Sequence, residues 1–460
     1  MRFIRVAAIA LAAAMIPAAL SCQKDEQEAE KFERADVETF KRDMSDLSSF
    51  ELPNGITVYL QEEHTTDQIA IETLYPVGFM DEPKGLPQLS HVTEHLAVYC
   101  ASGPFGTEEA WNLLRTDRGM VNAETLGDFI HFDYIVKTKH LEDVLRVEAA
   151  RLGGITCDAD ILKREQGKVV SEIDQTISTP KLALTKFAMM ALNQAMNYGQ
   201  MRVDIREGAR RITIAEVQGF QREYFRPDDM VMIIIGDFKK ADVEALVRSH
   251  LESIPRRPAP PVLVPKLARD LHATWDVTAS AIYYVAPGPY DDYRERLVLS
   301  LFGSFLNQFM NSSPALYGGN QIIYCTNQIY RVREMPFFVY AQPAAGRTVA
   351  EVGPLLLQHL EGAIKLLDED SRIDGIKAGA TSFMTSSMLK PDSPDYPMSH
   401  HQVIGQEALN VGMRHLLREG RTSDEFVAEV NAITPDEFRS IVKSRLTRSR
   451  MFEVTFLPAR

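Results

Sequence analysis

The stretch that decides how this sequence is interpreted is Ser90-His91-Val92-Thr93-Glu94-His95-Leu96-Ala97-Val98-Tyr99-Cys100. Its apolar residues recur at helical spacing, which predicts a helix. At about 100° per residue, His91 and His95 share one face of that helix and can bind one metal ion together. Glu94 lies on the same side and can reach a water molecule there without being a ligand. Two metal-free histidines beside an acid are the alternative, but histidine is scarce in this chain, and the chance occurrence of the spacing is about 0.02.

A catalytic zinc site needs a third protein ligand and one open position. The helical stretch from Ala159 to Thr176 offers two candidates, Glu165 and Glu172, which are seven residues apart and therefore share a helix face. Periodicity does not choose between them. On composition alone, the stretch would be a solvated charged helix.

The rest of the sequence shows a mixed α/β rhythm that occurs twice. Strands are expected at 57–60, after the turn Asn54-Gly55, and at 69–77, 230–235, 279–285, 337–340 and 452–456. Helices are expected at 90–100, 141–153, 159–176, 241–251 and 349–367. Four prolines between Pro255 and Pro261 indicate a stiff linker. We therefore predict an α+β fold with two domains, 49–254 and 266–460, joined by a linker at 255–265.

Composition is that of an ordinary globular protein, with 45% hydrophobic and 25% charged residues. The formal net charge of −13 disfavours a phosphate backbone as ligand, so no nucleic acid partner is expected. Four cysteines are too few for a disulfide scaffold. We expect Cys100, Cys157 and Cys325 to be buried, unreactive thiols.

Two further patterns receive structural interpretations. The neighbouring His400 and His401 point apart and are expected in a loop rather than at a metal. Phe129 and Phe132 alternate with polar residues, which indicates a half-buried strand.

The amino terminus has the pattern of a secretory signal peptide over residues 1–21. Arg2 and Arg5 give a basic start, and residues 6–20 form an uncharged apolar run that is too short to span a bilayer comfortably. Leu20-Ser21-Cys22 resembles the end of a bacterial lipobox, which predicts lipidation of Cys22. Ordinary signal cleavage with Cys22 as a bystander is the alternative.

Residues 22–48 are predicted to be a charged tether. Eight acids and five bases fall within residues 23–44, and such a segment cannot bury enough apolar surface to fold alone. Gln23 directly after the cysteine resembles outer-membrane sorting. We expect an exported outer membrane lipoprotein that faces the periplasm or the cell surface, held to the membrane by its lipid anchor.

The string His91-x-x-Glu94-His95, with Glu172 lying 77 residues beyond His95, resembles the inverted zinc motif of the M16 metallopeptidases. This is the family of insulinase, pitrilysin and the mitochondrial processing peptidase. The resemblance implies Zn²⁺ as the cofactor, Glu172 as the third ligand, Glu165 as a support of the site and Glu94 as the general base.

The resemblance extends along residues 50 to about 460. Val77-Gly78-Phe79-Met80-Asp81-Glu82-Pro83-Lys84-Gly85 resembles the lead-in to the zinc helix. Gly119-Met120-Val121-Asn122-Ala123-Glu124-Thr125, with Asp128, resembles the strand on which the family binds substrate, which implies substrate-binding roles for Asn122 and Ala123. The fold implied is two similar domains, each a mixed sheet layered with helices, that together form half of a clamshell.

The sequence departs from the family at one place. The family completes its site with an Arg and a Tyr seven residues apart, and here Tyr324 is present but Tyr317 stands in place of the Arg. Short family members work as pairs of chains, some of which divide zinc and Arg/Tyr between them. The departure implies a heterodimer in which this chain carries zinc. A homodimer using Tyr324 and another arginine, such as Arg331 or Arg333, is the alternative.

The function expected is that of a zinc endopeptidase that hydrolyses peptides or unfolded polypeptides. Glu94 would act as the general base. Tyr324, or the Arg and Tyr of a partner, would stabilise the oxyanion. The alternative is a non-catalytic binding or scaffold subunit of an M16-type complex, although such a chain would have no reason to keep Glu94 together with all three ligands.

Overall fold

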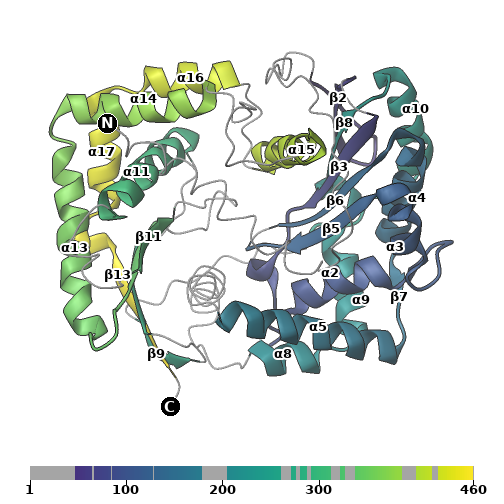
Figure 1. Ribbon diagram of the computed structural model, residues 1–460, viewed down its shortest axis with the longest axis horizontal. Helices are drawn as coiled ribbons and strands as arrows, with labels where there is room; N and C mark the ends of the chain where they lie inside the picture. The colour runs from purple at the N-terminus through teal and green to yellow at the C-terminus, as the bar shows by residue number, and fades with distance from the viewer. Residues whose placement is uncertain are drawn as a thin grey trace, which may run out of the picture.

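The chain folds around two β-sheets, each built from residues on one side of the Pro-rich segment 255–261 (Figure 1). The computed structural model describes residues 47–458 apart from 65–66, 84, 128, 179–204, 261–270, 276–279, 287–291, 312–321, 327–336, 386–399 and 417–422. The predicted signal peptide, Cys22, Tyr317, Arg331 and Arg333 lie outside the described residues. Among the residues that are described, no helix has the length and apolar character needed to cross a membrane.

The first sheet has six strands in the order β1-β2-β8-β3-β6-β5. In chain order these are β1 (Ser48–Glu51), β2 (Thr57–Glu62), β3 (Gln68–Tyr75), β5 (Met120–Thr125), β6 (Ile130–Lys137) and β8 (Val231–Gly236). β2 and β8 are parallel, and the other neighbouring pairs are antiparallel. The strand β5, which carries Asn122 and Ala123, therefore lies at one edge of the sheet.

Helices cover one face of this sheet and enclose the larger apolar core of the molecule. They are α2 (Leu89–Tyr99), α3 (Glu109–Leu114), α4 (Leu141–Gly153), α5 (Ala159–Ser178), α8 (Ile205–Arg211), α9 (Ile214–Tyr224) and α10 (Lys240–Leu251). The short strands β4 (Ala101–Ser102) and β7 (Ile155–Thr156) pair with each other where α2 ends and α5 is about to begin. α2 packs against both α5 and α9. This packing brings the two helices that carry the predicted ligands side by side.

The second sheet has five strands in the order β11-β12-β10-β13-β9. Its strands are β9 (Leu271–Trp275), β10 (Ala281–Ala286), β11 (Ile322–Thr326), β12 (Phe337–Gln342) and β13 (Phe452–Pro458). The helices α11 (Tyr293–Asn311), α13 (Val349–Leu366), α14 (Asp370–Thr385), α16 (Ser423–Ala432) and α17 (Pro435–Arg445) form a second core with one face of it. Both halves are thus α+β layers, as predicted.

The helix α15 (His400–Leu416) leaves its own half and packs on the other face of the first sheet (Figure 1). Ile404, Ala408 and Val411 form an apolar cluster there with residues of β3, β6 and β8. At Gly412 a Cβ atom would lie 2.5 Å from Leu74 Cδ1, so glycine lets the helix approach this closely. The first sheet is consequently covered on both faces.

Two sequence interpretations are wrong because of α15. His400 and His401 begin this helix rather than lying in a loop. The strand containing Phe132 is buried on both faces, since α15 packs on the side that was expected to be exposed. The other predicted strands and helices form, and their ends differ from the prediction by one or two residues where they differ at all.

Candidate metal centre

The helix α2 starts in a fixed position because the buried carboxylate of Glu82 accepts hydrogen bonds at its first turn. Glu82 Oε2 accepts from the backbone N–H of Gln88 at 2.9 Å, and Oε1 accepts from the N–H of Ser90 at 3.0 Å and its Oγ at 2.5 Å. These hydrogen bonds satisfy N–H groups at the helix N-terminus that would otherwise be unpaired. The histidine one residue further on is therefore held on a well-anchored turn.

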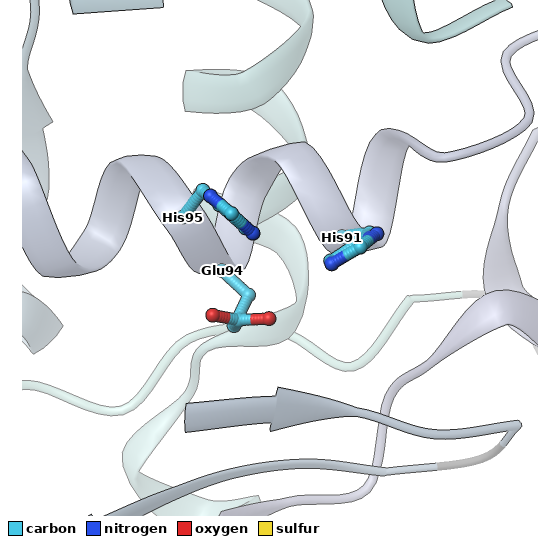
Figure 2. A group of neighbouring side chains, drawn as sticks. All are labelled: His91, Glu94 and His95. Atoms are coloured by element: carbon cyan, nitrogen blue, oxygen red, sulfur yellow. The ribbon is translucent and has the colours of Figure 1, made fainter. Parts of the chain in front are cut away.

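His91, Glu94 and His95 lie close together on α2 (Figure 2). One nitrogen or oxygen atom from each of the three side chains lies within 4.8 Å of the other two. His91 is partly buried, with its Nδ1 3.0 Å from Gln88 Oε1, whereas Glu94 and His95 are buried. The helical spacing predicted from the sequence thus produces one compact group.

The carboxylate of Glu172, on α5, faces both imidazoles. Glu172 Oε2 lies 3.1 Å from Nε2 of His91, and Oε1 lies 3.6 Å from Nε2 of His95. Two ligand atoms of a tetrahedral zinc ion, each about 2.0–2.2 Å from the metal, are about 3.3–3.5 Å apart. The observed separations bracket this value. Two imidazoles and one carboxylate are also a donor set that zinc takes, so the residues present fit the metal.

Glu165 lies on the far side of His95. Its Oε2 is 3.1 Å from Nδ1 of His95, the ring nitrogen that points away from Glu172. Its Oε1 is held by Arg164 Nε at 2.7 Å and Lys168 Nζ at 3.0 Å. A carboxylate that accepts from the second nitrogen of a metal-binding histidine orients the ring rather than binding the metal. The geometry therefore separates the two glutamates that periodicity left equivalent.

In the metal-free protein, the protonated imidazole of His95 and the carboxylate of Glu172 form an ion pair. Burial alone lowers the pKa of the His95 imidazole, but its hydrogen bonds to Glu165 and Glu172 outweigh burial and raise that pKa to about 10. Burial alone raises the pKa of Glu172, but hydrogen bonds from His91 and His95 hold it well below its usual range. A cation at this place would replace a proton between the same atoms.

Glu94 is oriented by the strand that borders the group. Thr125, the last residue of β5, donates a hydrogen bond from Oγ1 to Glu94 Oε2 at 3.2 Å. Asn122 lies on the same edge strand, where its Nδ2 donates to Asp133 Oδ2 at 3.3 Å, and Ala123 follows it. The general-base candidate and the predicted substrate strand are thus adjacent.

Tyr324 lies in β11 of the second sheet, with its backbone opposite Tyr340 of β12. The structure does not describe its side chain. The predicted role of Tyr324 therefore stays a prediction.

A disulfide bond between Cys100 and Cys157 corrects the expectation of free thiols for these two residues. Cys100 is the C-cap of α2, and Cys157 lies two residues before α5 begins. The bridge joins the two helices that carry the predicted ligands. Cys100 ends one predicted helix and Cys157 lies just before another, but their separation of 57 residues gave no signal that they meet.

Comparison with known proteins identifies the class of fold. The crystal structure of a protease from Helicobacter pylori superposes with a TM-score of 0.70 at 17% identity, covering 90% of this chain and 99% of that one. The periplasmic protease PqqL from Escherichia coli gives a TM-score of 0.64 at 15% identity, and the match covers 90% of this chain but 48% of that one. The fold is that of the M16-type peptidases.

Sequence comparison agrees with this class. Residues 211–372 match the family model described as "Peptidase M16 inactive domain". Zinc protease PqqE of Helicobacter pylori is 23% identical over 210 residues, or 45% of this chain and 47% of that protein. Mouse insulin-degrading enzyme is 25% identical over 236 residues, or 47% of this chain and 22% of that enzyme. The chain thus spans about half or less of the length of these relatives. In sequence the chain is thus similar to M16-type peptidases over part of its length.

Proposed function

We propose that this chain is the zinc-bearing subunit of an exported M16-type endopeptidase that cleaves peptides or unfolded polypeptides. The observation that carries the proposal is the position of the Glu172 carboxylate, at 3.1 and 3.6 Å from Nε2 of His91 and His95. These three residues would hold the ion. Relatives named zinc proteases support zinc as that ion.

The reaction assigned to the site is peptide bond hydrolysis. When bound, zinc lowers the pKa of a water molecule from about 15.7 toward 7 and polarises the peptide carbonyl. Glu94 takes the proton of the attacking water as general base and then delivers it to the leaving amine. The hydrogen bond from Thr125 holds the Glu94 carboxylate in position for both transfers. Glu165 fixes the ring of His95 through its Nδ1.

The substrate would bind as an additional strand on β5. In the described part of the sheet, β5 has a neighbour, β6, on one side. An extended peptide that pairs with its other side gains main-chain hydrogen bonds and places the scissile bond beside the metal group. Asn122 and Ala123 would be the contact residues. This mode suits unfolded segments better than folded proteins.

A second chain would complete the site. Tyr317 stands where the family has an arginine, and a phenol cannot supply the fixed charge and forked donors of a guanidinium. The chain also corresponds to 48% of PqqL, which supports the assembly of two such units. We propose a heterodimer in which the partner contributes Arg and Tyr, with a homodimer using Tyr324 as the alternative.

Export and lipid anchoring at Cys22 complete the proposal. The disulfide between Cys100 and Cys157 supports an oxidising compartment, since disulfides persist outside the reducing cytosol. Outer-membrane attachment through a diacylated Cys22 would leave the catalytic domains on a charged tether. Mass spectrometry of the mature amino terminus tests this part, and an unmodified terminus beginning elsewhere contradicts it.

A non-catalytic subunit is the second candidate function, because the family model that matches residues 211–372 describes an inactive domain. Those residues follow the helices that carry His91, Glu94, His95 and Glu172, so the description does not concern the metal group itself. Metal analysis and peptide cleavage by the wild type and Glu94→Gln, each alone and mixed with candidate partner chains, separate the two functions. Bound zinc without cleavage in any mixture favours the scaffold.

A further inference from the structure

A second group of metal-ligating side chains lies within the first sheet, away from α2 and α5. Glu72 of β3 and His131 and Asp133 of β6 place one donor atom each within 4.8 Å of one another. We call these three residues the sheet cluster. Glu72 stands directly opposite Asp133 in the strand register, and His131 is the diagonal neighbour. All three therefore project from the same face of the sheet, because side chains on a strand alternate.

The sheet cluster lies on the face that α15 covers. Leu74 and Ile135, which follow the cluster residues on the same face of their strands, belong to the apolar group that packs against α15. Phe132, which alternates with the cluster residues on β6, belongs instead to the core on the α2 side. The sheet thus separates the cluster from the candidate zinc centre.

In the metal-free sheet cluster the imidazole is in direct contact with one carboxylate and close to two others. Nδ1 of His131 lies 2.5 Å from Asp133 Oδ1 and 3.3 Å from Glu72 Oε2. A third carboxylate, that of Glu124 on β5, lies 3.8 Å from the other ring nitrogen. One imidazole is therefore surrounded by three carboxylates from three neighbouring strands.

The charge and the burial of these side chains favour a bound cation in the sheet cluster. The side chains of Glu72 and His131 are 4% and 3% exposed. They stand beside the carboxylates of Asp133 and Glu124, which are 26% and 27% exposed, so a cation between them would offset negative charge that burial penalises. In addition, the buried Nε2 atom of His131 makes no hydrogen bond to any described residue, which native proteins rarely tolerate.

We propose that the sheet cluster binds a divalent transition-metal ion through Glu72, Asp133 and Nδ1 of His131. Two carboxylates and an imidazole suit Mn²⁺ or Zn²⁺, whereas Ca²⁺ and Mg²⁺ take oxygen ligands. With the metal on Nδ1, the ring proton moves to Nε2, where it points to Glu124 as an outer partner. The ion neutralises two of the three negative charges.

The ion would stiffen the edge of the sheet. Asp133 is a proposed ligand, and its second oxygen accepts the hydrogen bond from Asn122. Binding of the ion therefore fixes the position of a residue that we place under the substrate. This consequence rests on the proposed function, but the presence of the ion does not.

Metal stoichiometry tests the proposal separately from activity. Bound metal is removed from the full chain with a chelator, and the chain is dialysed against Mn²⁺ or against Zn²⁺. Its metal content is then measured by inductively coupled plasma mass spectrometry. We expect two equivalents of Zn²⁺ per chain in the wild type, and one in the near-isosteric variants Glu72→Gln and Asp133→Asn. His91→Ala should also retain one equivalent, which then belongs to the sheet cluster. Glu244→Gln on α10, whose side chain is 42% exposed, is the matched control and should retain two.

The outcomes distinguish the two sites. A single equivalent that is lost in His91→Ala and kept in Glu72→Gln overturns the sheet-cluster site and leaves the zinc centre intact. A single equivalent with the opposite pattern overturns the zinc centre and supports the sheet cluster. Because Glu72→Gln could unfold the sheet, circular dichroism of each variant accompanies the measurement. If Glu72→Gln unfolds, Asp133→Asn, whose side chain is 26% exposed, decides the question.

Discussion

Among the described residues, two groups place a buried imidazole between carboxylates, and they are built in different ways. His95 has Glu165 on one ring nitrogen and Glu172 on the other, and its group is assembled from two helices. His131 has Asp133 and Glu72 on one nitrogen and Glu124 on the other, and its group is assembled from three strands. The first group opens toward solvent, since the Glu172 side chain is 48% exposed, whereas Glu72 is 4% exposed.

This difference in exposure separates a reactive role from a structural one. Substrate and water must reach a hydrolytic centre, so one of its ligands borders solvent. An ion in the sheet cluster would lie on the face that α15 covers, bordered by Asp133 at 26% exposure, and could act on substrate only through the strands it joins. Histidine and carboxylate side chains therefore support a reactive role in one group and a structural role in the other. The helices and strands around each group decide which role it has.

The largest effect is expected when Glu94 is changed to Gln. The amide of the variant would keep the shape of the side chain but could not accept the proton, so peptide cleavage should fall about 100- to 10,000-fold. Zinc content should stay at the wild-type level, since Glu94 is not among the proposed ligands. Glu244→Gln on α10, whose side chain is 42% exposed, is the control and should cleave nearly as well as wild type. Equal loss in both variants would contradict the role of Glu94.

The second prediction compares the two glutamates of α5. Glu172→Gln should lower zinc affinity more than 100-fold because a charged ligand is lost, whereas Glu165→Gln should lower it about 10- to 100-fold through the ring of His95. Competition with a coloured chelator measures both. If Glu165→Gln lost more zinc than Glu172→Gln, the assignment of the third ligand would be reversed.

The third prediction concerns the bridge between the two helices of the zinc centre. Replacing both Cys100 and Cys157 by alanine should lower the free energy of unfolding by about 2–4 kcal/mol, as measured in urea. Zinc affinity should fall with it, since α2 and α5 are no longer tied. A reductant should lower both the free energy of unfolding and the zinc affinity of the wild type. It should change neither quantity in the double variant. Unaltered zinc affinity would show that the β4–β7 pair suffices to hold the helices.

The smallest effect tests whether α15 covers the sheet cluster. Gly412→Ala places a methyl group 2.5 Å from Leu74 Cδ1 and should destabilise the fold by about 1–3 kcal/mol. Gly362→Ala in α13 meets no atom within 4 Å and should stabilise by about 0.5–1 kcal/mol. Thermal unfolding compares the two. If Gly412→Ala left the stability unchanged, α15 would not pack tightly on the sheet.

The sequence made the helix-built group visible because its geometry is local. His91 and His95 are one turn apart, and a single periodicity argument places them on one face. The choice between Glu165 and Glu172 was different, because it depends on how α5 crosses α2. The family resemblance suggested Glu172, whose carboxylate lies 3.1 and 3.6 Å from the two imidazoles, and its role as a ligand stays a prediction.

The strand-built group was invisible for the opposite reason. Glu72 and His131 meet through strand register, which no short motif reports. The alternation around Phe132 correctly indicated a strand, but the polar positions were taken to face solvent. His131 is buried and Asp133 is 26% exposed, because α15, whose first residue is more than 260 positions further along the chain, covers that face. The exposure of this strand face thus depends on long-range packing, which the local sequence pattern does not report.

The position of α15 also has a consequence for the order in which the chain can fold. The first sheet is complete once residue 236 has been made, but the helix that covers its second face begins at His400. During synthesis at about 5–20 residues per second, the apolar surface formed by Leu74, Ile233 and Ile235 stays uncovered for about 10–30 seconds. We therefore expect that the first half does not fold independently. A fragment that ends at the Pro-rich segment would carry this surface permanently and would aggregate rather than yield a small active domain.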